Sequence, residues 1–285
     1  MKILLTGANG FLGSYFKKKY ANAYNIQTFS FLSDNFNALH IDGVDVIIHL
    51  SALVHQMGGA SADKYEKINV TQTLDLAKKA KENGVKHFVF MSSVKVYGEE
   101  SNAPYSEDAL CYPKDEYGKS KLKAENELKK LESDDFIVSI VRTPIVYGYG
   151  VKANIKNLIS LVEKVPILPF RDIQNRRSMI YVGNLCHLVD VIITKQVNGI
   201  FLASDDKPLS TTKLIELIAD GLGKKVYLVR FPFFENFLKL VKPSIYKRLY
   251  GSLEVDNSKT RKELQFKNLY SVEEGIQYMI KGERL

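Results

Sequence analysis

Apolar and polar residues along the chain follow two different periods. Short apolar runs such as "KILLT" and "VDVIIHL" alternate with longer stretches in which apolar residues recur every three or four positions. Such an alternation is typical of a parallel β-sheet that helices cover on both faces. The expected fold class is therefore α/β, with a doubly wound parallel sheet. The pattern predicts strands at residues 2–6, 26–31, 44–50, 87–91 and 136–142.

Two helices are predicted most clearly. The first covers residues 70–83, follows the candidate cap Asn69 and ends before Gly84, as helix C-termini commonly do. The second covers residues 116–131 and is long and charged. Only about a dozen residues separate the second predicted strand from Val44, fewer than a crossover helix and a further strand need. We therefore expect the third strand of the sheet to be short or absent.

The pattern loosens after Tyr147, where prolines at positions 166, 169, 208, 232 and 243 interrupt it. We interpret this part as a smaller C-terminal lobe over the carboxyl edge of the sheet, where open α/β sheets bind ligands. One late strand and helix, around residues 178–193, are expected to return to the sheet. The predicted division is a sheet domain at residues 1–147, which residues 178–204 rejoin, and a substrate-binding lobe at residues 148–177 and 205–285.

Composition and charge narrow the class of protein. The 285 residues carry a net charge of +8, but the tightest basic cluster, Lys17 to Lys19, falls on the outer part of a predicted helix. A solvated helix face explains such a cluster more often than nucleic-acid binding does, and a positive field favours small anions such as nucleotides. We therefore expect no nucleic-acid partner.

Targeting and metal-binding patterns are missing from the sequence. No apolar run is long enough for a membrane span, the start lacks the pattern of a signal peptide, and the five histidines show no metal-ligand spacing. Cys111 and Cys186 lie far apart, with no metal or redox spacing. We therefore expect no bound metal and a reducing, cytoplasmic setting.

The segment "LLTGANGFLGSYF" places Gly7, Gly10 and Gly13 between the first predicted strand and a helix. Gly7 permits a tight turn, Gly10 lets the backbone approach a pyrophosphate, and Gly13 lets the helix pack on the sheet. The N–H groups and the dipole at the helix start favour the negative charge of a phosphate. A tight turn without a ligand is the alternative, but the position after a strand predicts a dinucleotide-binding Rossmann fold.

The identity of the dinucleotide is open between NAD and NADP. NAD enzymes commonly end the second strand with an acidic residue that binds the ribose hydroxyls. Here that strand ends in Ser30 and Phe31, Asp34 follows three residues later, and no arginine stands ready for a 2′-phosphate. The missing carboxylate slightly favours NADP.

Tyr117 and Lys121 are four residues apart in a predicted helix, so both can face one cleft. A nearby ammonium stabilises a phenolate and lowers its pKa, which would let Tyr117 act as a general acid or base. Ser92 and Ser93 end a predicted strand at the same rim, where a hydroxyl can hold the reacting oxygen. Chance spacing and strand-end caps are the alternatives, but the combination with the glycine turn favours a catalytic site.

These segments together resemble the extended short-chain dehydrogenase/reductases, the nucleotide-sugar epimerase/dehydratase family. The resemblance rests on "TGANGFLG", "VDVIIHLSA", "NVTQTLDLAKKA", "MSSVKVYGE" and "YGKSKLKAE". It implies a homodimer and a catalytic triad of Ser93, Tyr117 and Lys121, in which Lys121 also binds the nicotinamide ribose. It further implies cofactor contacts from Gly7, Asn9, Gly10, Phe11, Leu12, Gly13, Leu50, Ser51, Ala52, Asn69, Tyr117, Lys121 and Pro144.

Further stretches resemble one subgroup of that family. "VRTPIVYGYGVKANIKNLISLV", "PILPFRDIQNRRSMIYVGNL" and "RLYGSLEVDNSKTRKEL" are similar to reductases of the 4-keto group of UDP-linked 2-acetamido-2,6-dideoxyhexoses, which serve surface polysaccharide biosynthesis. The resemblance implies a UDP-sugar substrate, held by Ser93, Asn154 and Arg177, with Arg176 assisting. Dehydratases of the family carry an Asp–Glu pair directly after the catalytic hydroxyl, where this chain has Val94 and Lys95, so we do not expect dehydration.

Three functions fit the sequence to different degrees. The first is the ketoreductase, and its alternative is a 4-epimerase of UDP-glucose or UDP-N-acetylglucosamine that uses the same residues twice. The third is a non-catalytic NAD(P)-binding regulator, against which the intact triad argues. Residues 231–253 are aromatic and basic: they either lie on a membrane surface or, as the break at Pro243 favours, pack as a helical cap on the substrate lobe.

Overall fold

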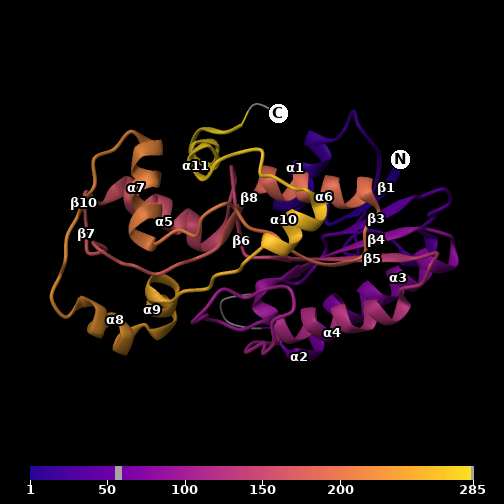
Figure 1. Ribbon diagram of the computed structural model, residues 1–285, viewed down its shortest axis with the longest axis horizontal. Helices are drawn as coiled ribbons and strands as arrows, with labels where there is room; N and C mark the ends of the chain where they lie inside the picture. Colours follow the sequence, from indigo (N-terminus) through magenta and orange to yellow (C-terminus); the bar gives the residue numbers. More distant parts are fainter. Residues whose placement is uncertain (55–59, 284–285) are drawn as a thin grey trace.

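The computed structural model describes residues 1–54 and 60–283 (Figure 1). At its centre lies a six-stranded sheet in which every neighbouring pair of strands is parallel, in the order β2-β1-β3-β4-β5-β9. The doubly wound α/β fold class predicted from the sequence is confirmed. The strands are β1 (Lys2–Thr6), β2 (Asn25–Phe29), β3 (Val46–His49), β4 (His87–Ser93), β5 (Ile137–Thr143) and β9 (Gly199–Leu202).

Side chains alternate across the sheet and build a separate core on each face. Ile3 and Leu5 belong to the core under α1 (Phe11–Lys19) and α6 (Val182–Lys195). Leu4, between them, belongs to the core under α3 (Gln72–Glu82) and α4 (Glu116–Leu131). All three side chains are fully buried, and Figure 1 shows the two helical layers on opposite sides of the strands. The strands are nearly continuous apolar runs because both faces of the sheet are covered.

The segment between β2 and β3 confirms that the third strand is absent. Residues 30–45 form only a short 3-10 helix, η1 (Phe36–Ala38), so β2 is the edge of the sheet. β2 ends two residues earlier than predicted because the chain turns back after Phe29. In this turn the carbonyl of Ser30 accepts a hydrogen bond from the N–H of Asp34 at 2.9 Å.

The helical run before β4 begins eight residues earlier than the sequence predicted. α2 (Ala62–Tyr65) starts behind its N-cap Ser61 and continues through a π-helical segment, η2 (Glu66–Thr71), into α3. Asn69 lies inside this run, so its predicted role as the N-cap is wrong. The overlooked signal was Ser61, whose side chain accepts the N–H of Lys64, as N-cap serines do.

The late strand expected around residues 178–193 does not join the main sheet. β8 (Met179–Tyr181) pairs with β6 (Ile145–Tyr147), and the strand that returns to the sheet is β9, which lies beside β5 after α6. Another small sheet joins β7 (Ile167–Leu168) to β10 (Tyr227–Leu228), and a 3-10 helix, η3 (Val94–Val96), follows β4.

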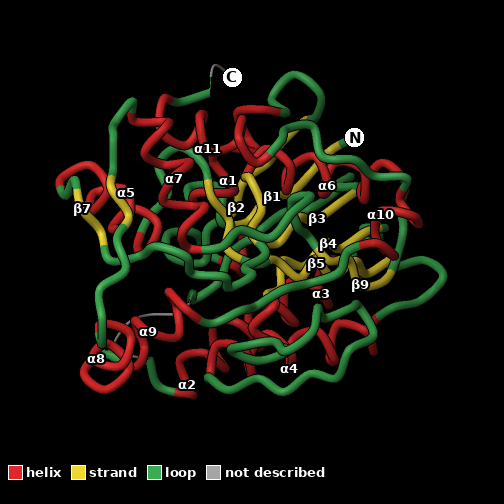
Figure 2. Tube along the Cα trace, turned by 60° about the vertical axis from the view of Figure 1, so that its left-hand side comes forward, coloured by secondary structure: helices red, strands yellow, loops and turns green. Residues whose placement is uncertain are grey.

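The remaining helices belong to the C-terminal half of the chain. Figures 1 and 2 place α5 (Ala153–Lys164), α7 (Thr211–Leu222), α8 (Phe234–Val241) and α9 (Pro243–Tyr250) together toward one end of the molecule, beside the sheet. α10 (Ser258–Leu264) and α11 (Val272–Lys281) complete the chain. Within the described ranges, no helix combines the length and the apolar character that crossing a membrane requires.

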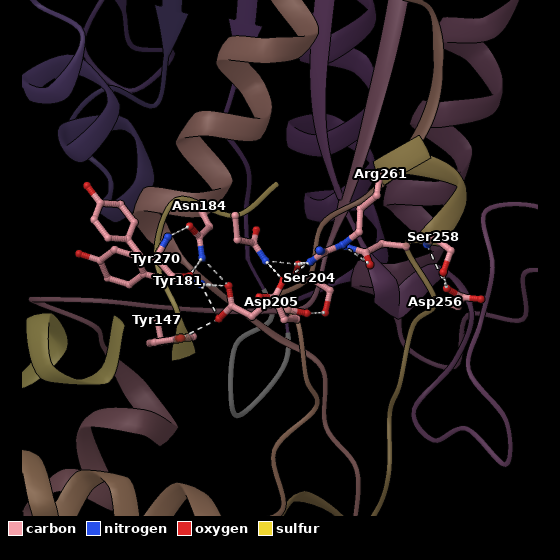
Figure 3. A network of polar contacts seen from close by, with 12 residues as sticks. Tyr147, Tyr181, Asn184, Ser204, Asp205, Asp256, Ser258, Arg261 and Tyr270 are labelled. Atoms are coloured by element: carbon pink, nitrogen blue, oxygen red, sulfur yellow. Dashed lines mark hydrogen bonds and ion pairs between the residues drawn. The ribbon is translucent and has the colours of Figure 1, made fainter. Parts of the chain in front are cut away.

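A buried hydrogen-bond network centred on Asp205 joins β6, β8, α6 and the residues just before α11 (Figure 3). Asp205 follows β9, is 4% exposed, and accepts from the Tyr147 hydroxyl of β6 at 2.6 Å and from the Asn184 amide of α6 at 2.8 Å. The Asn184 side chain also bonds the backbone of Tyr270, just before α11. One carboxylate therefore fixes the small β6–β8 sheet against α6 and against the start of the last helix.

The C-terminal segment is fastened to α1 by a second carboxylate. Glu283 accepts hydrogen bonds from the hydroxyls of Tyr15 and Tyr181, both at 2.5 Å, and of Tyr270 at 2.8 Å, and it lies 3.5 Å from Lys19 Nζ. Burial acts to raise the pKa of Glu283, but the tyrosine hydrogen bonds and Lys19 outweigh it and hold the pKa below its ordinary value. The ionised carboxylate thus joins α1, β8 and the α11 region.

Candidate active site

The glycine turn lies at the carboxyl edge of the sheet, between β1 and α1, where open α/β sheets bind ligands. Gly7 has a φ of +69°, and a Cβ at this position would lie 2.9 Å from the backbone of Leu50 and Ser51. A Cβ at Gly13 would lie 2.3 Å from the Gly7 carbonyl oxygen. In this described turn no side chain caps the start of α1, and its first turn carries no acidic residue. The turn therefore fits the pyrophosphate of a dinucleotide.

Most other residues predicted to contact the cofactor follow the carboxyl ends of β1, β3 or β5. Leu50 and Ser51 lie directly behind Gly7, and the N–H of Ser51 donates to Thr6 Oγ1 at 3.2 Å. This bond orients the loop after β3 toward the glycine turn. Partly buried or exposed positions at the same edge are Asn9, Gly10, Phe11, Leu12, Ala52 and Pro144.

The side-chain amide of Asn69 is engaged by groups of the chain itself. Its side chain is fully buried, and its amide exchanges two hydrogen bonds with the backbone of Leu53 at 2.8 and 3.0 Å. The same amide donates to Ser120 Oγ of α4 at 3.0 Å. Asn69 therefore supports the loop after β3 from behind, and the cofactor contact that the family resemblance implies for it stays a prediction.

The first turn of α4 brings Tyr117 to Ser93. Asp115 caps the helix by accepting the N–H of Gly118 at 2.7 Å. A Cβ at Gly118 would lie 2.7 Å from the carbonyl oxygen of Lys95, so glycine lets α4 approach the chain just after β4. The Ser93 hydroxyl lies close enough to the Tyr117 hydroxyl to act on its pKa. The local sequence thus builds the serine–tyrosine pair at the carboxyl edge of the sheet.

Lys121 lies one turn further along α4 and is 2% exposed. Its Nζ donates to the Met91 carbonyl at 2.8 Å and lies 4.5 Å from the centre of the Phe90 ring. Burial lowers the pKa of Lys121 to about 7, while Glu125 acts in the opposite direction. His49 is almost fully buried nearby, and its burial, assisted by the charge of Lys121, lowers the pKa of the imidazole to about 3. His49 is therefore neutral.

The pKa of Tyr117 departs from the expectation drawn from the sequence. Burial raises the pKa to about 12, the nearby Ser93 hydroxyl acts to lower it, and Asp115 and Tyr65 raise it further. The Lys121 ammonium is directed to a backbone carbonyl. The expected lowering of the Tyr117 pKa by Lys121 is therefore wrong for this arrangement, and Tyr117 is protonated at neutral pH.

A buried ion pair behind Ser93 was not predicted from the sequence. Arg142, near the end of β5, donates from Nη2 to Glu125 Oε2 at 2.6 Å and from Nη1 to the Tyr97 hydroxyl at 2.7 Å. Ser92 donates to the same carboxylate, so its neighbour Ser93 is the serine that lies next to Tyr117 of α4. The available signal was a glutamate four residues after the helix lysine, paired with an arginine in a buried strand.

The predicted substrate residues Arg177 and Asn154 both lie close to the end of α9. Asn154 belongs to the first turn of α5, and Arg177 precedes β8. Arg177 Nη1 donates to the carbonyls of Gly251 at 3.0 Å and Lys247 at 3.4 Å, and burial lowers the pKa of its guanidinium. Asn154 Oδ1 accepts from Arg248 Nη1 at 3.1 Å. Arg248, which was not predicted from the sequence, contacts Asn154 and brings a second guanidinium to this region, where its charge also acts to lower the pKa of Arg177.

Arg176 faces elsewhere. It is exposed, and its guanidinium binds Glu254 through two contacts of 2.6 and 2.7 Å. Its predicted assistance in substrate binding is not supported, because these donors are engaged by a carboxylate. Among the residues that the structure describes, no group of three or more His, Cys, Asp or Glu side chains is arranged to hold a metal ion.

The strand order and the glycine turn define the class first: this is an α/β protein with a dinucleotide-binding fold. The chain belongs to the NAD dependent epimerase/dehydratase family, whose sequence profile matches residues 3–202. The resemblance seen in the sequence motifs is therefore confirmed, and the protein belongs to a family of NAD-dependent enzymes. The slight preference for NADP drawn from the missing carboxylate is not supported by this membership.

Comparison with known proteins adds two relatives and a solved structure. A UDP-glucose 4-epimerase of Vibrio cholerae is 36% identical over 96% of this chain and 93% of its own length. An N-acetyl-alpha-D-glucosaminyl-diphospho-ditrans,octacis-undecaprenol 4-epimerase of Escherichia coli O157:H7 is 26% identical over 81% of this chain and 75% of its own. The structure of a UDP-glucuronic acid 4-epimerase from Bacillus cereus in complex with NAD has a TM-score of 0.79 and 20% identity, covering 99% of this chain and 98% of that one. The last comparison supports the fold.

Proposed function

We propose that the protein is an NAD-dependent 4-epimerase of a UDP-linked hexose. The observation that carries this proposal is the position of Tyr117 next to Ser93, with Lys121 one helical turn away on α4, at the sheet edge that also carries the glycine turn. The similarity to a UDP-glucose 4-epimerase over 96% of the chain supports the same reaction. Epimerisation at C4 needs one proton-transfer group that works in both directions, and a single tyrosine can supply it.

Each residue of the triad has its own task in this proposal. The phenolate form of Tyr117 takes the proton of the C4 hydroxyl when C4 is oxidised, and the resulting phenol returns the proton when C4 is reduced. Ser93 donates a hydrogen bond to the sugar oxygen and holds it next to the phenol. Lys121 binds the ribose next to the nicotinamide with its buried ammonium. A nicotinamide ring, when bound, supplies the acceptor and donor of hydride.

A C4 ketoreductase is the second candidate, favoured by the protonation state of Tyr117. A reductase needs a proton donor from the start, and burial keeps the pKa of Tyr117 at about 12. The resemblance of residues 141–162, 166–185 and 248–264 to reductases of UDP-linked 4-keto-6-deoxy-N-acetylhexosamines supports the same reading. Surface polysaccharide biosynthesis is the setting that we propose for either activity.

Dehydration is not proposed because of the side chain that follows the serine strand. Lys95 is a cation held by two carboxylates: it pairs with Glu99, and its Nζ lies 3.3 Å from Asp115. A paired ammonium offers neither the base nor the acid that elimination of water needs.

We propose NAD as the cofactor, and Asp34 as the residue that selects it. The turn after β2 brings the Asp34 carboxylate to the strand end, where it accepts the N–H of Ser30 at 2.8 Å. A carboxylate at this place suits ribose hydroxyls and repels a 2′-phosphate. Asp34 thereby takes the place of the acidic residue that the sequence lacks at position 31.

The two candidate reactions can be separated with purified protein. An epimerase interconverts UDP-glucose with UDP-galactose, or their N-acetyl forms, without added nicotinamide, and NMR reads the C4 configuration. A reductase instead consumes NADH only when a UDP-4-keto-6-deoxy-N-acetylhexosamine is supplied. Consumption of NADH without interconversion would replace the first proposal by the second, and inactivity on every sugar of both panels would reject both.

Variants of the serine–tyrosine pair test the assignment itself. Tyr117→Phe is expected to lower kcat by about 10²- to 10⁴-fold, the usual contribution of a general acid or base, while NAD still binds. Ser93→Ala is expected to lower kcat by a smaller factor. Tyr112→Phe, a change at an exposed position on the same chain segment, is the matched control. Full activity of the Tyr117→Phe protein would contradict the assignment.

We also propose a homodimer and a cytoplasmic setting. Both cysteines of the chain are free, Cys111 partly buried and Cys186 buried, which supports a reducing compartment. Sedimentation equilibrium of the purified protein tests the dimer, because it reports the mass in solution directly. A monomer mass at all concentrations would reject that proposal.

A further inference from the structure

The segment 231–245 exposes a concentration of apolar side chains. Of the sixteen large apolar side chains that are exposed in the described part of the chain, six lie in these fifteen residues. Figures 1 and 2 show the segment, with α8 and α9, at the periphery of the molecule, away from the central sheet. We call it the α8–α9 surface; it consists of Phe231, Phe233, Phe237, Leu240, Val241 and Ile245, which are 41 to 84% exposed.

Packing within the chain does not account for these side chains. Phe234 and Leu238, four residues apart, hold α8 in place: Phe234 contacts the Phe170 ring edge to face, with ring centres 6.0 Å apart, and Leu238 is 8% exposed. Phe233, Phe237 and Leu240 follow each other by four and three residues and form a different face of the helix. α8 is thus apolar on its inner face and on an outer face as well.

The backbone also presents one of these rings to solvent. Phe233 precedes α8 with a φ of +63°, a conformation that bulky residues rarely adopt, and it is 83% exposed. Burial of the Phe233 ring within the chain does not offset the cost of this backbone conformation. Only contact with a surface outside the chain would bury the ring.

The charge around the α8–α9 surface indicates what kind of external surface it contacts. Residues 230–250 carry five basic residues and a single acidic one, Glu235, so that half of the net charge of +8 lies in a short part of the 285 residues. The Glu235 carboxylate accepts from the Tyr246 hydroxyl at 3.2 Å. Exposed aromatic and aliphatic side chains flanked by lysines and arginines are typical of helices that lie in the interface of anionic bilayers.

We propose that the α8–α9 surface docks the protein on the surface of an anionic phospholipid bilayer. Phe233, Phe237 and Leu240 enter the boundary between headgroups and acyl chains, and Lys239 and Lys242 bind the negative headgroups. Docking does not change the chemistry of the site, but it places the site at the membrane: the carbonyls that Arg177 binds belong to α9 and the residue after it, Lys247 and Gly251. A substrate-binding region next to a bilayer gives access to partners that reside there.

The test is co-sedimentation of the full-length protein with vesicles. Wild-type protein is expected to bind vesicles that contain phosphatidylglycerol and to bind pure phosphatidylcholine vesicles much more weakly, with binding that falls as salt is added. The triple variant Phe233→Ser/Phe237→Ser/Leu240→Ser is expected to bind anionic vesicles at least about tenfold more weakly. Lys239→Gln/Lys242→Gln is expected to lose about tenfold or more, chiefly at low salt.

Matched controls separate the surface from general charge and apolarity. Lys17→Gln/Lys18→Gln removes the same charge from an exposed part of α1, and Leu32→Ser removes an apolar side chain that is 98% exposed. Both are expected to bind like wild type. Unchanged thermal unfolding and unchanged turnover of a water-soluble UDP-sugar show that the surface variants are folded.

Three results would overturn the proposal. The first is wild-type protein that stays in the supernatant with anionic vesicles. The second is equal loss of binding in the control variants, which would mean that net charge or exposed apolar area acts wherever it lies on the protein. The third is concentration-dependent self-association that the triple variant abolishes while vesicle binding is absent, which would make a second copy of the chain the occupant of this surface.

Discussion

Glu125 and Arg142 form an ion pair that is almost completely buried, with 2.6 Å between Glu125 Oε2 and Arg142 Nη2. The pair joins α4 to β5, and it lies one helical turn beyond Lys121. Glu125 also acts against the lowering of the Lys121 pKa by burial. Because Ser92 donates to the same carboxylate, the pair holds the end of the serine strand as well. The geometry of the proposed triad therefore depends on a carboxylate that touches none of the reacting atoms.

Removing one member of this pair is expected to destabilise the protein strongly. Glu125→Gln leaves the Arg142 charge buried without its partner, which typically costs about 3–5 kcal/mol of unfolding free energy. The double variant Glu125→Leu/Arg142→Met is expected to lose less than the sum of the single variants, because no unpaired charge remains. Denaturant unfolding measures all of these values.

An exposed pair on the same helix provides the control. Glu127 binds Lys130 at 2.6 Å, and the side chains are 36% and 68% exposed, so Glu127→Gln is expected to cost less than about 1 kcal/mol. Equal losses for Glu125→Gln and Glu127→Gln would show that burial of the Glu125–Arg142 pair has no energetic consequence.

Lys121 predicts how stability changes with pH. Its pKa is about 7 in the folded protein and 10.5 for an ordinary lysine, so between these values the unfolded chain holds a proton that the folded chain does not. The contribution of Lys121 to the unfolding free energy is therefore complete above the ordinary lysine pKa and is lost as the pH falls through about 7. The stability of wild type relative to Lys121→Met is expected to rise from pH 7 toward higher pH.

Denaturant unfolding of both proteins without cofactor, at several pH values, measures this difference. Subtracting the Lys121→Met curve removes the contributions of the other lysines and of the tyrosines, which titrate in both proteins. A difference that stays constant over this pH range would mean that Lys121 keeps an ordinary pKa.

Asp34 predicts the preference between the two dinucleotides. Asp34→Asn keeps an oxygen that can accept the N–H of Ser30 but removes the charge that repels a 2′-phosphate. We expect the ratio of the Kd for NADP to that for NAD to fall about tenfold, which corresponds to roughly 1.4 kcal/mol. Fluorescence titration with each reduced dinucleotide measures the ratio. Asp42→Asn makes the same charge change at an exposed position before β3, and an equal shift in that variant would contradict the role of Asp34.

Glu283 predicts a contribution to stability that is lost in acid. Because the pKa of Glu283 is below its ordinary value in the folded protein, the stabilisation is present above the unfolded pKa of 4.5 and is lost as the pH falls through the folded pKa. Glu283→Gln is expected to lower the unfolding free energy by about 1–3 kcal/mol at neutral pH, the worth of a hydrogen bond to a charged group. Its difference from wild type should shrink at acidic pH.

Thermal unfolding across the acidic range measures this difference. Glu263→Gln removes one charge from an exposed position on α10 and serves as the control, since only Glu283 is held by three tyrosines. A Glu283→Gln difference that does not depend on pH would contradict the ionised state of the carboxylate.

Features that depend on near neighbours in the chain could be predicted from the sequence. The apolar runs determined the parallel strands, since a strand buried on both faces has few polar positions. The spacing of Gly7, Gly10 and Gly13 determined the turn, and the four-residue spacing of Tyr117 and Lys121 put them on one face of α4. The short distance between two strands was enough to predict the missing third strand, because chain length limits what can be built there.

Only the tertiary structure decided what lies beside these elements. Arg248 meets Asn154 across 94 positions of the chain, and nothing near Arg176 in the sequence shows that Glu254 engages it. Likewise, Asn69 is followed by a helical pattern, as a cap would be, yet packing places it inside a longer helix and against Leu53.

The pKa values show the same division. The four-residue spacing places the Lys121 ammonium near the Tyr117 phenol in the sequence. In the structure that ammonium donates to the Met91 carbonyl, and burial is the largest influence on the pKa of Tyr117. The spacing of residues along the chain determines which of them share a helix face, because the number of residues per helical turn is fixed. The partners and the solvation of those residues come from strands and helices that are distant in the chain, and only the packed fold brings them together.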